Sequence, residues 1–489
     1  MQATGDCQTI FKVGGFFSLR SGPKRGIVYG MEQKHEEKRG GRSILSEVTR
    51  LAWPTMLEQL MQTAVQYIDT FMVGSLGTLA TAAVGCTVTV NWLIGNAIHA
   101  LAVGFLAVIS QALGARDTRL AKRAAAQSVL TVLLVGAFTT AITLSLAGVI
   151  PTWMQADESI RETASRYFFI LYLPMFFRTA QIIFGTVLRA AGDTKTPMRV
   201  SVLVNVVNVA LNFLLIYPTR QKTLFDVTVT VPGAGWGVPG AAVASAAAFA
   251  LGGILTALAF FRHPEISPRG ESLRPQKDVL RPCLKIALPN MAQRFFTSLG
   301  YVVFAGCINA LGEISTAAHT VANTVESAFY VPGYGMQTAA ATLTGNAVGA
   351  KDPAKMKALS RVLIIMELVM MTVSGGLLFA FAPGMVTLFS KDAQVIALGA
   401  AVLRMVSLSE PFYGVSIVTE GMLQGAGRTG MPFVFNIICM WGVRICGTLV
   451  CTRALGLGLT SAWGCMIAGN MALLVCFRVY YRRVSHSVT

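Results

Sequence analysis

The 489-residue chain has little charge for its length, because only 13% of its residues are charged whereas 54% are hydrophobic. Soluble domains contain about 25% charged residues, so this composition argues against a soluble protein. A bilayer core about 30 Å thick is crossed by roughly 20 apolar residues in a helix. Apolar stretches of that length recur, and the sequence predicts twelve. The expected spans are residues 46–73, 79–112, 118–149, 158–188, 197–218, 236–261, 283–311, 314–347, 357–382, 394–423, 431–452 and 459–481.

Signatures of several other protein classes are missing. The chain contains no GxxxxGK[ST] loop, so we do not expect ATP-driven transport. The nine cysteines form no CxxC pair and most fall inside apolar spans, which indicates small core residues rather than a disulfide framework or a metal site. Residues 1–45 contain no apolar core of a signal peptide, so the first span should anchor the chain. Met31 precedes a short charged segment, and one hypothesis is that translation starts there and residues 1–30 are an upstream extension.

The charge that is present is basic, with 40 Lys and Arg against 23 Asp and Glu. Most of the basic residues lie in the N-terminal tail, in every second loop after it and at the C-terminus, whereas the alternate loops hold only Arg220, Lys222, Lys391 and Arg453. This alternation follows the positive-inside rule and predicts a multi-pass protein of the plasma (inner) membrane with both termini in the cytoplasm. The pattern does not suit a nucleic-acid surface, so no nucleic-acid partner is expected.

The sequence repeats itself with a shift of 235 residues. Pro54 then meets Pro289, and the segment Gln111-Ala-Leu-Gly-Ala-Arg-Asp117 meets Asn346-Ala-Val-Gly-Ala-Lys-Asp352. The register holds without a gap until the fifth span, after which the first copy has a longer outer loop at 219–235. Each copy has an even number of spans, so the copies are parallel repeats, as in transporters that work by alternating access.

Four segments in chain order carry a resemblance to a known family. They are Pro54 through Asp69-Thr-Phe-Met-Val-Gly74, Leu188-Arg-Ala-Ala-Gly-Asp-Thr-Lys-Thr-Pro197, Gly240-Ala-Ala-Val-Ala-Ser245, and Tyr330-Val-Pro-Gly-Tyr through Gly345-Asn-Ala-Val-Gly-Ala350. Over residues 46–480 the chain resembles the multidrug and toxic compound extrusion (MATE) family of the multidrug/oligosaccharidyl-lipid/polysaccharide flippase superfamily. The resemblance implies a two-lobe antiporter that exports organic, often cationic, compounds against an inward flow of H⁺ or Na⁺.

A stripe of polar side chains lies inside the first span. It consists of Glu58, Gln62, Gln66 and Asp69. Their spacing places them within about 80° of one another on a helix, so the stripe must face protein or a water-filled cavity. Hydrogen bonding between helices is one explanation of the glutamines. An ionisable group inside a bilayer is costly and marks a candidate functional site, and a carboxylate such as Asp69 can there exchange a proton or accept Na⁺.

The fifth span carries amides on one helical face at Asn205, Asn208 and Asn212. An amide both donates and accepts, so it can bond a carboxyl group in either protonation state. The MATE resemblance implies that Asn208 and Asn212 complete a cation pocket with Asp69 and that Ser245 of the sixth span contributes a hydroxyl. A small packing role for Ser245 is equally open.

This pocket is expected in the first copy only. The residues that the repeat places at Asp69, Asn208 and Asn212 are Phe304, Val443 and Gly447. The family's acidic positions in the second copy correspond to Thr297 and Tyr413, which argues against a second cation site at those residues. Glu326 is available instead, either to attract a cationic substrate or to pair with Arg294. The residues expected to line a central cavity are Glu58, Gln62, Gln66, Gln181, Gln293, Glu326 and Tyr413.

The sequence therefore predicts an all-α polytopic membrane protein with two pseudo-symmetric six-helix lobes. The expected parts are a cytoplasmic tail (1–45), an N-lobe (46–261), a cytoplasmic linker (262–282), a C-lobe (283–481) and a second tail (482–489). The expected function is secondary multidrug efflux by a non-enzymatic, monomeric antiporter that meets small organic substrates and membrane lipid and needs no cofactor or metal beyond the coupling ion.

Three alternatives stay open. A lipid-linked precursor flippase of the same superfamily would need a more cationic cleft than span arginines such as Arg178, Arg294 and Arg444 provide. A major-facilitator transporter shares twelve spans, but the Gly192-Asp-Thr element and Asp69 do not fit it. A membrane receptor or scaffold gives no reason for the duplication.

Overall fold

The computed structural model describes residues 25–224 and 227–487, so the hypothesis about residues 1–30 falls mostly outside the described residues. Residues 1–44 and 45–489 form separate compact units. The helix α1 begins at Arg25, within the predicted tail. All contacts described below lie in the second unit.

The N-lobe consists of six membrane-crossing segments and a hairpin. Its elements are α1 (Arg25–Gly74), α2 (Thr78–Gly114), α3 (Thr118–Leu146), α4 (Ile150–Trp153), α5 (Glu158–Tyr172), α6 (Met175–Ala190), α7 (Lys195–Leu215), β1 (Pro218–Leu224), β2 (Val227–Ala234) and α8 (Gly237–Arg262).

The C-lobe repeats this order without the hairpin. Its elements are α9 (Lys277–Asn309), α10 (Glu313–Gly349), α11 (Pro353–Thr387), α12 (Ala393–Ser407), α13 (Glu410–Gly425), α14 (Gly430–Ile437), the π-helix η1 (Ile438–Cys446), α15 (Gly447–Leu449), the π-helix η2 (Val450–Ala454) and α16 (Leu459–Ser487). Within the described residues the two lobes supply twelve crossings, because α5 and α6 share one, α12 and α13 share one, and α14 to η2 form one.

Three of the crossings differ in character from the others. Nine are long and apolar enough to be recognised as membrane spans in the described part of the chain, if each bent pair counts as one. The helices α1, α9 and α10 are long enough but more polar, since α1 carries the stripe from Glu58 to Asp69 and α10 buries Glu326. Polar membrane helices face a protein-lined interior rather than lipid, so these three should carry the functional groups.

The repeat is visible in the backbone turns. Gly77 and Gly312, which the repeat pairs, have φ angles of 110° and 101°, a conformation that only glycine adopts at low cost. Asp117 and Asp352 are also repeat partners, and each caps the helix that follows it by accepting a hydrogen bond from a backbone N–H three residues on. The duplicated sequence therefore folds twice into the same turns.

Two crossings bend where the sequence predicts continuous spans. The α5–α6 pair bends by 49° and the α12–α13 pair by 55°. Pro174 lies in the first break and Pro411 directly after the second. Proline lacks an amide donor and disfavours a helical residue before it, which explains why each span divides into two helices.

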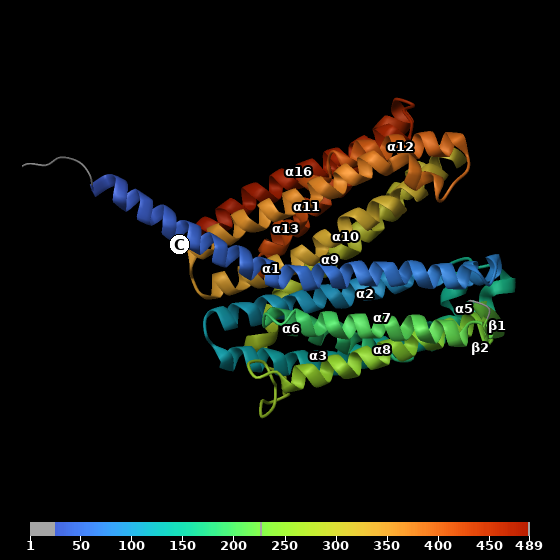
Figure 1. The fold of residues 1–489 in the computed structure, drawn as a ribbon, viewed down its shortest axis with the longest axis horizontal. Helices are drawn as coiled ribbons and strands as arrows, with labels where there is room; N and C mark the ends of the chain where they lie inside the picture. The colour runs from blue at the N-terminus through green and yellow to red at the C-terminus, as the bar shows by residue number, and fades with distance from the viewer. Residues whose placement is uncertain (1–24, 225–226, 488–489) are drawn as a thin grey trace, which may run out of the picture. The chain divides into compact units, whose positions relative to one another are not determined.

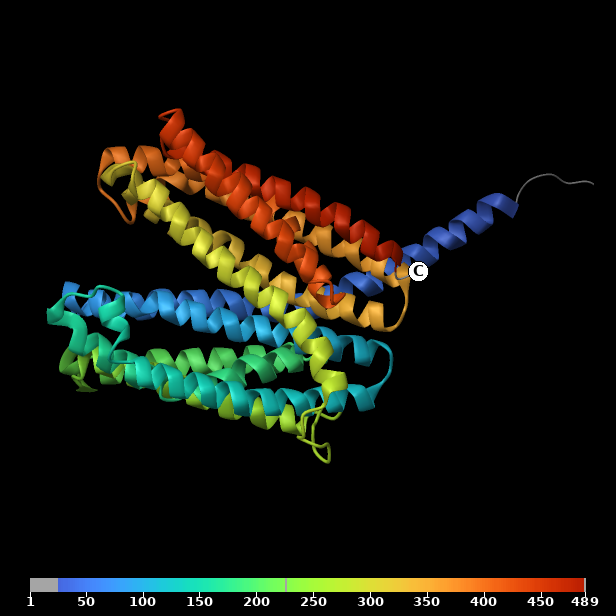
Figure 2. The same cartoon turned by 180° about the vertical axis from the view of Figure 1, so that it is seen from behind.

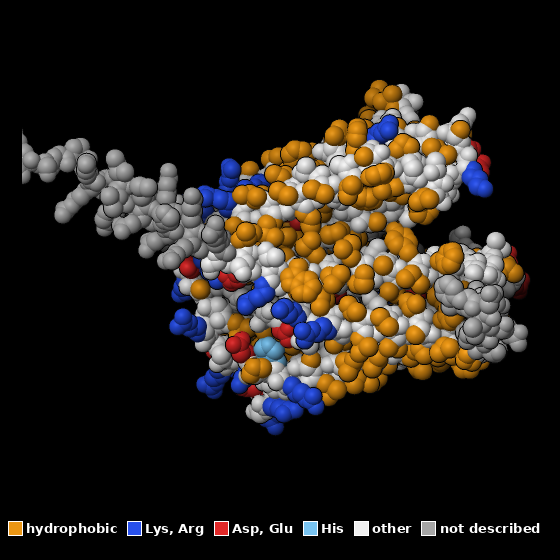
Figure 3. Space-filling view, in the orientation of Figure 1, with side chains coloured by type: hydrophobic (Ala, Val, Ile, Leu, Met, Phe, Trp, Pro, Cys, Tyr) orange, Lys and Arg blue, Asp and Glu red, His pale blue; other side chains and the backbone are white. Residues whose placement is uncertain are grey.

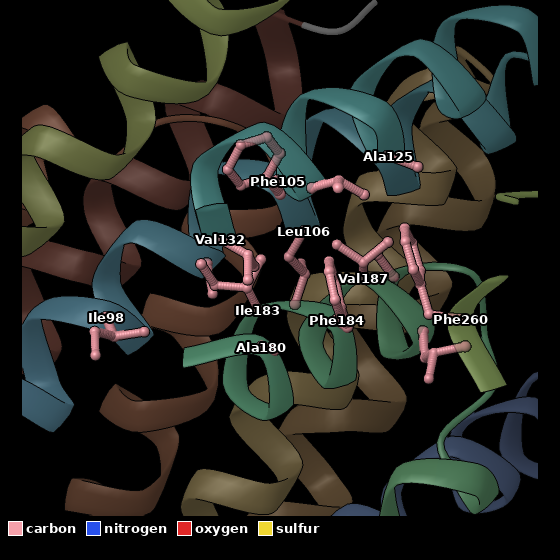
Figure 4. Packing of buried hydrophobic residues seen from close by; sticks show 14 of the residues in the cluster. Ile98, Phe105, Leu106, Ala125, Val132, Ala180, Ile183, Phe184, Val187 and Phe260 are labelled. Carbon is pink, nitrogen blue, oxygen red and sulfur yellow. The ribbon is translucent and has the colours of Figure 1, made fainter. Parts of the chain in front are cut away.

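The bilayer-facing surface and the core are both apolar. Phe71, Phe138 and Val373 are largely exposed, as expected of side chains that face lipid. Inside the N-lobe, Phe105 of α2 packs with Phe184 of α6 and other buried side chains, and α8 contributes Phe260 (Figure 4). A separate core in the C-lobe surrounds Phe304 and Trp463. Each lobe therefore has its own hydrophobic core.

The lobes meet at one end and diverge towards the other (Figure 1 and Figure 2). Lys and Arg side chains gather at the end where the lobes meet, which we call the basic end, and the surface is notched between the lobes at the opposite, open end (Figure 3). Hydrogen bonds across the lobes confirm close contact near the basic end: Thr55 Oγ1 donates to the Gly335 carbonyl at 2.8 Å, and Thr342 Oγ1 to the Arg189 carbonyl at 3.3 Å.

The contact between α2 and α10 is reciprocal. A Cβ atom added at Gly114 would strike the backbone carbonyl of Asn346, and one added at Gly349 would strike that of Gln111. Gly114 and Gly349 are repeat partners, and so are Gln111 and Asn346. We call this contact the α2–α10 crossing. It lies on the pseudo-two-fold axis and allows backbone-to-backbone approach, as glycine pairs do in other membrane helices.

The long outer loop of the N-lobe forms a β-hairpin rather than an irregular loop. β1 and β2 pair antiparallel from Pro218, opposite Ala234, to Leu224, opposite Val227. The alternating Val and Thr residues of 227–231 are typical of a strand, a signal that the span-based prediction did not use.

Candidate functional site

The N-lobe brings the four predicted cation-coupling residues into one hydrogen-bonded chain. Asn212 Nδ2 donates to Asp69 Oδ1 at 2.6 Å and to Asn208 Oδ1 at 3.2 Å. Asn208 Nδ2 in turn donates to Ser245 Oγ at 3.1 Å. The chain runs from α1 through α7 to α8, and we call it the N-lobe polar cluster.

Local sequence explains why the three helices can approach. Asn208 and Asn212 are one turn apart on α7, so their amides follow each other along one face. Gly240 at the start of α8 has its Cα facing the Leu215 carbonyl of α7, where a Cβ atom would come within 2.5 Å. This close approach brings Ser245, further along α8, to the amide of Asn208.

The cluster is buried on one side and accessible on the other. Asn208 and Asn212 are 5% and 1% exposed, whereas Asp69 is half-buried. Asn212 Oδ1 is buried and has no hydrogen-bond partner, although both asparagines donate through their nitrogens. Oxygen atoms of carboxylate, amide and hydroxyl groups are the ligands that hard cations prefer, so the cluster offers the chemistry for a proton or Na⁺.

The rest of the α1 stripe divides into an accessible and a buried part. Gln62 and Gln66 are exposed, on the same face as Asp69. Glu58 is 7% exposed, and its carboxylate accepts two hydrogen bonds from Arg189 Nη1 of α6, at 2.9 and 3.0 Å. Glu58 therefore holds α1 to α6 and does not line an opening in this conformation.

Two other residues expected along a cavity are engaged in packing or hydrogen bonding. Gln181 lies against Gly252 of α8, where a Cβ atom would come within 2.5 Å of its amide oxygen. Gln293 is 7% exposed and donates to Glu420 Oε1 at 2.7 Å. Gln424 donates to the same oxygen at 3.1 Å. Gln293 is therefore interior, whereas Gln181 is half-buried.

The C-lobe position that corresponds to Asp69 is filled differently. Phe304 is buried, and the guanidinium of Arg444, from η1, lies 4.2 Å from the centre of its ring and 4.8 Å from that of Tyr301. A cation over an aromatic face is stabilised by the ring quadrupole. The C-lobe therefore places the positive charge of Arg444 beside Phe304, at the position where the N-lobe has the carboxylate of Asp69.

The C-lobe also buries three glutamates on three helices. Glu326 of α10, Glu367 of α11 and Glu410 of α13 are 5%, 0% and 1% exposed. Both carboxylate oxygens of Glu367 and of Glu410 lack a hydrogen-bond partner. The Glu367 carboxylate occupies space left by Gly333 and Gly414, where a Cβ atom would come within 3 Å of Oε1.

The prediction for this lobe was incomplete. Among the described residues Glu326 makes no ion pair within 4.0 Å, and Arg294 donates instead to Asn96 Oδ1 at 3.5 Å. Tyr413 lies beside two other tyrosines, with its hydroxyl 3.5 Å from that of Tyr334. Glu367 was missed, although a carboxylate within a predicted span was the signal that identifies it.

A surface pocket at the basic end has a different character. It measures 420 Å³ and is lined by charged groups of both signs, including Arg50, Asp193, Lys195, His263 and Glu265. The Asp193 carboxylate already accepts a hydrogen bond from Thr196 N, in the first turn of α7, at 3.0 Å. The pocket contains none of the intramembrane polar residues described above.

Comparison with known proteins gives a consistent result. The MatE family model matches residues 54–214 and 289–450, one match in each lobe. The chain is 26% identical over 440 residues to a probable multidrug resistance protein NorM of Thermotoga maritima, covering 90% of this chain and 92% of that protein. It is 23% identical to the probable multidrug resistance protein YoeA of Bacillus subtilis, covering 91% and 95%.

Solved structures share the fold. An outward-facing MATE transporter superposes with a TM-score of 0.83 at 24% identity, covering 91% of this chain and 97% of the other. A transporter of the same superfamily from Pyrococcus furiosus, described as having a binding pocket of reversed polarity, superposes equally well, with a TM-score of 0.83, 24% identity and coverage of 91% and 96%.

Proposed function

Since the chain belongs to the MatE family, we propose that it is a secondary multidrug efflux antiporter, which exports organic, often cationic, compounds in exchange for H⁺ or Na⁺. The observation that carries this proposal is the N-lobe polar cluster, in which Asp69, Asn212, Asn208 and Ser245 form one hydrogen-bonded chain. Asp69 is the cation-binding group, and the two asparagines change their hydrogen bonding when the charge of Asp69 changes.

The asparagines are suited to this task because an amide can present either its nitrogen or its oxygen. Asn212 now donates to the carboxylate. When Asp69 binds a proton or Na⁺, rotation of that amide would present the oxygen that has no partner at present. The cluster would thereby change its hydrogen bonding with each cation bound and released, which couples the site to the packing of α1 against α7.

The distribution of basic residues supports an orientation. Lys and Arg gather at the end where the lobes meet (Figure 3), and the positive-inside rule places that end in the cytoplasm. The notch between the lobes then opens to the outside, and both termini are cytoplasmic in a plasma (inner) membrane protein. We propose that a monomer carries out the transport cycle and needs no cofactor other than the coupling ion. In this monomer the N-lobe ends at residue 261 and the C-lobe begins at residue 283, with the linker between them.

Arg178 and Arg444 favour this function over that of a lipid-linked precursor flippase, whereas Arg294 reaches Asn96 of the other lobe. Arg178 donates to Asn91 Oδ1 and lies 4.5 Å from the ring centre of Phe249, and Arg444 lies over Phe304. Both guanidinium groups are engaged within their own lobe. A flippase for anionic lipid-linked precursors would need such groups free to meet a phosphate.

The test is efflux from proteoliposomes that contain purified protein and a fluorescent organic cation. An imposed H⁺ gradient and an imposed Na⁺ gradient are applied separately, with the membrane potential clamped in both. Efflux that accelerates with one of the two gradients supports the proposal and identifies the ion. Equal rates with and without either gradient would contradict an antiporter, and gradient-independent movement of a lipid-linked probe would favour the flippase.

A further inference from the structure

Two cysteine thiols meet near the open end of the C-lobe. Cys451 of η2 and Cys465 of α16 have their sulfur atoms 3.7 Å apart. Both side chains are half-buried, so neither is sealed inside the core. The two helices are consecutive crossings, joined by a short turn at residues 455–458.

Close helix approach explains the contact. A Cβ atom added at Gly447, one turn before Cys451, would lie 3.2 Å from the Cys465 sulfur. The absence of a side chain at that position lets α16 press against the end of the preceding crossing. The thiol of Cys465 therefore lies over the turn that carries Cys451, and the sulfur atoms need to approach by less than about 2 Å to reach the 2.05 Å or so of a disulfide.

The N-lobe stabilises the corresponding connection between its last two crossings in a different way. The repeat partner of Cys451 is Ile216, which directly precedes the β1–β2 hairpin. The hairpin ladder fixes the connection between α7 and α8 through backbone hydrogen bonds. The C-lobe has no such hairpin in the described residues, and its last crossing before α16 ends in a π-helix, whose wider turns pack less regularly than an α-helix.

We propose that Cys451 and Cys465 form a reversible disulfide that fastens α16 to η2 at the open end of the C-lobe. The Cys465 or Cys451 thiolate attacks the disulfide of an extracytoplasmic thiol oxidant, and a mixed disulfide forms. The second thiolate then displaces the oxidant as a dithiol, so the protein loses two electrons and two protons and the oxidant gains them. The oxidising compartment rests on the proposed orientation, since disulfides persist outside the cytoplasm.

A second thiol pair on the same two crossings provides an internal control. Cys439 of η1 lies close enough to Cys476 of α16 for the two side chains to interact. Cys439 is 4% exposed and lies deeper in the lobe, nearer the basic end. A hydrophilic oxidant should reach the outer pair and leave this inner pair reduced.

Trypsin separates the two partners of the outer pair. Cleavage after Arg444, Arg453 and Arg478 gives peptide 445–453, which contains Cys451, and peptide 454–478, which contains Cys465. Purified protein is treated with oxidised glutathione, a hydrophilic disulfide, and protein from cells is alkylated at harvest to trap its native thiol state. Mass spectrometry then measures the linked peptides. C446S and C476S variants assign the bond, because each peptide contains one of these other cysteines.

The expected result is a linked pair of peptides in both samples that disappears on reduction and in C451S and C465S. With a maleimide reagent, the oxidised protein should carry two fewer labels than the reduced protein, in wild type and in C439S/C476S alike. Oxidation should raise the melting temperature in detergent by roughly 5 °C.

Different outcomes overturn different parts of the proposal. Failure to link in purified protein, with both thiols open to maleimide, overturns the geometry. A bond that forms in purified protein but is absent from protein trapped in cells overturns the modification as native. Peptide linkage is measured without transport, so its failure is distinguishable from failure of antiport, which the efflux assay reports separately.

Discussion

The two lobes share a backbone but differ in the groups that they bury. At one pair of repeat positions the N-lobe has Asp69, bonded to two asparagines, and the C-lobe has Phe304 under the guanidinium of Arg444. At another pair the N-lobe has Asn91, which accepts from Arg178, and the C-lobe has Glu326. Duplication fixed the helices and turns, whereas charge diverged in the interior. Our proposal of cation coupling in the N-lobe rests on that divergence.

The contact between the first and fourth crossings of each lobe also differs in the side chains that form it. In the N-lobe Glu58 pairs with Arg189. Gly185 leaves room for this guanidinium, because a Cβ atom added at Gly185 would lie 3.6 Å from it. In the C-lobe the corresponding residues are Gln293, Gln424 and Glu420, joined by two hydrogen bonds. An ion pair in one lobe is therefore replaced by two amides around one carboxylate in the other.

The largest effect is expected from removing the one carboxylate of the N-lobe polar cluster. Asp69→Asn keeps the shape of the side chain but removes the negative charge that takes up a proton or holds Na⁺, so gradient-driven efflux should fall to the rate of protein-free liposomes. Asp157→Asn, which removes only an exposed helix cap, is the control and should keep efflux within about twofold. Full gradient-driven efflux in Asp69→Asn would contradict coupling at the N-lobe polar cluster and would direct the search for the coupling site to the C-lobe.

Breaking the N-lobe ion pair should cost stability next. Arg189→Gln leaves the Glu58 carboxylate buried without its partner and should destabilise the protein by about 3 kcal/mol, measured as a lower melting temperature in detergent. The triple change E58Q/G185E/R189Q installs the C-lobe residues and should recover most of that loss. If the triple variant is no more stable than Arg189→Gln, the two arrangements are not interchangeable between the lobes.

Substitutions at the α2–α10 crossing should destabilise the protein equally whichever lobe carries them. Gly349→Ala and Gly114→Ala each drive a methyl group into a facing backbone carbonyl, and each should cost about 2 kcal/mol through overpacking. Gly384→Ala, with nothing within 4 Å, is the matched control in the same kind of helix. Melting temperatures that differ strongly between the two crossing variants would contradict the symmetry of this contact.

The smallest effect concerns two ion pairs, one exposed and one half-buried, that join the lobes at the basic end. Arg123 of α3 pairs with Asp278 of α9, and Lys355 of α11 pairs with Glu47 of α1. The hydrogen bond and charge of Arg123 lower the pKa of Asp278. A lowered folded-state pKa means that this stabilisation is present above the ordinary Asp pKa of about 3.9 and is lost as pH falls through the folded value.

Asp278→Asn should therefore lower the melting temperature slightly at pH 7, and this difference should shrink as the pH falls below the ordinary Asp pKa of about 3.9. Salt should reduce the difference at pH 7, because exposed pairs are screened. Glu47→Gln tests the counterpart pair and should behave in the same direction. A difference between wild type and Asp278→Asn that grows on acidification would contradict this account.

Much of the fold and the N-lobe polar cluster could be predicted because they depend on regular helices. The period of 3.6 residues places Asn208 above Asn212, and the repeat excludes the cluster from the C-lobe. The bends after Tyr172 and Ser407 were not predicted, because proline position alone does not say whether a long apolar span kinks or ends. The partners of Glu58 and Gln293 depend on contacts between helices distant in sequence, which no local pattern specifies.

The α2–α10 crossing has a consequence for the origin of the molecule. Gly114 meets Asn346 and Gly349 meets Gln111, so each surface is complementary to its own copy. That is the property of an isologous interface, through which identical subunits form a closed pair. A six-helix ancestor with the same glycine would already have dimerised about this axis, and fusion of two genes would then have freed each half to change its buried charges separately.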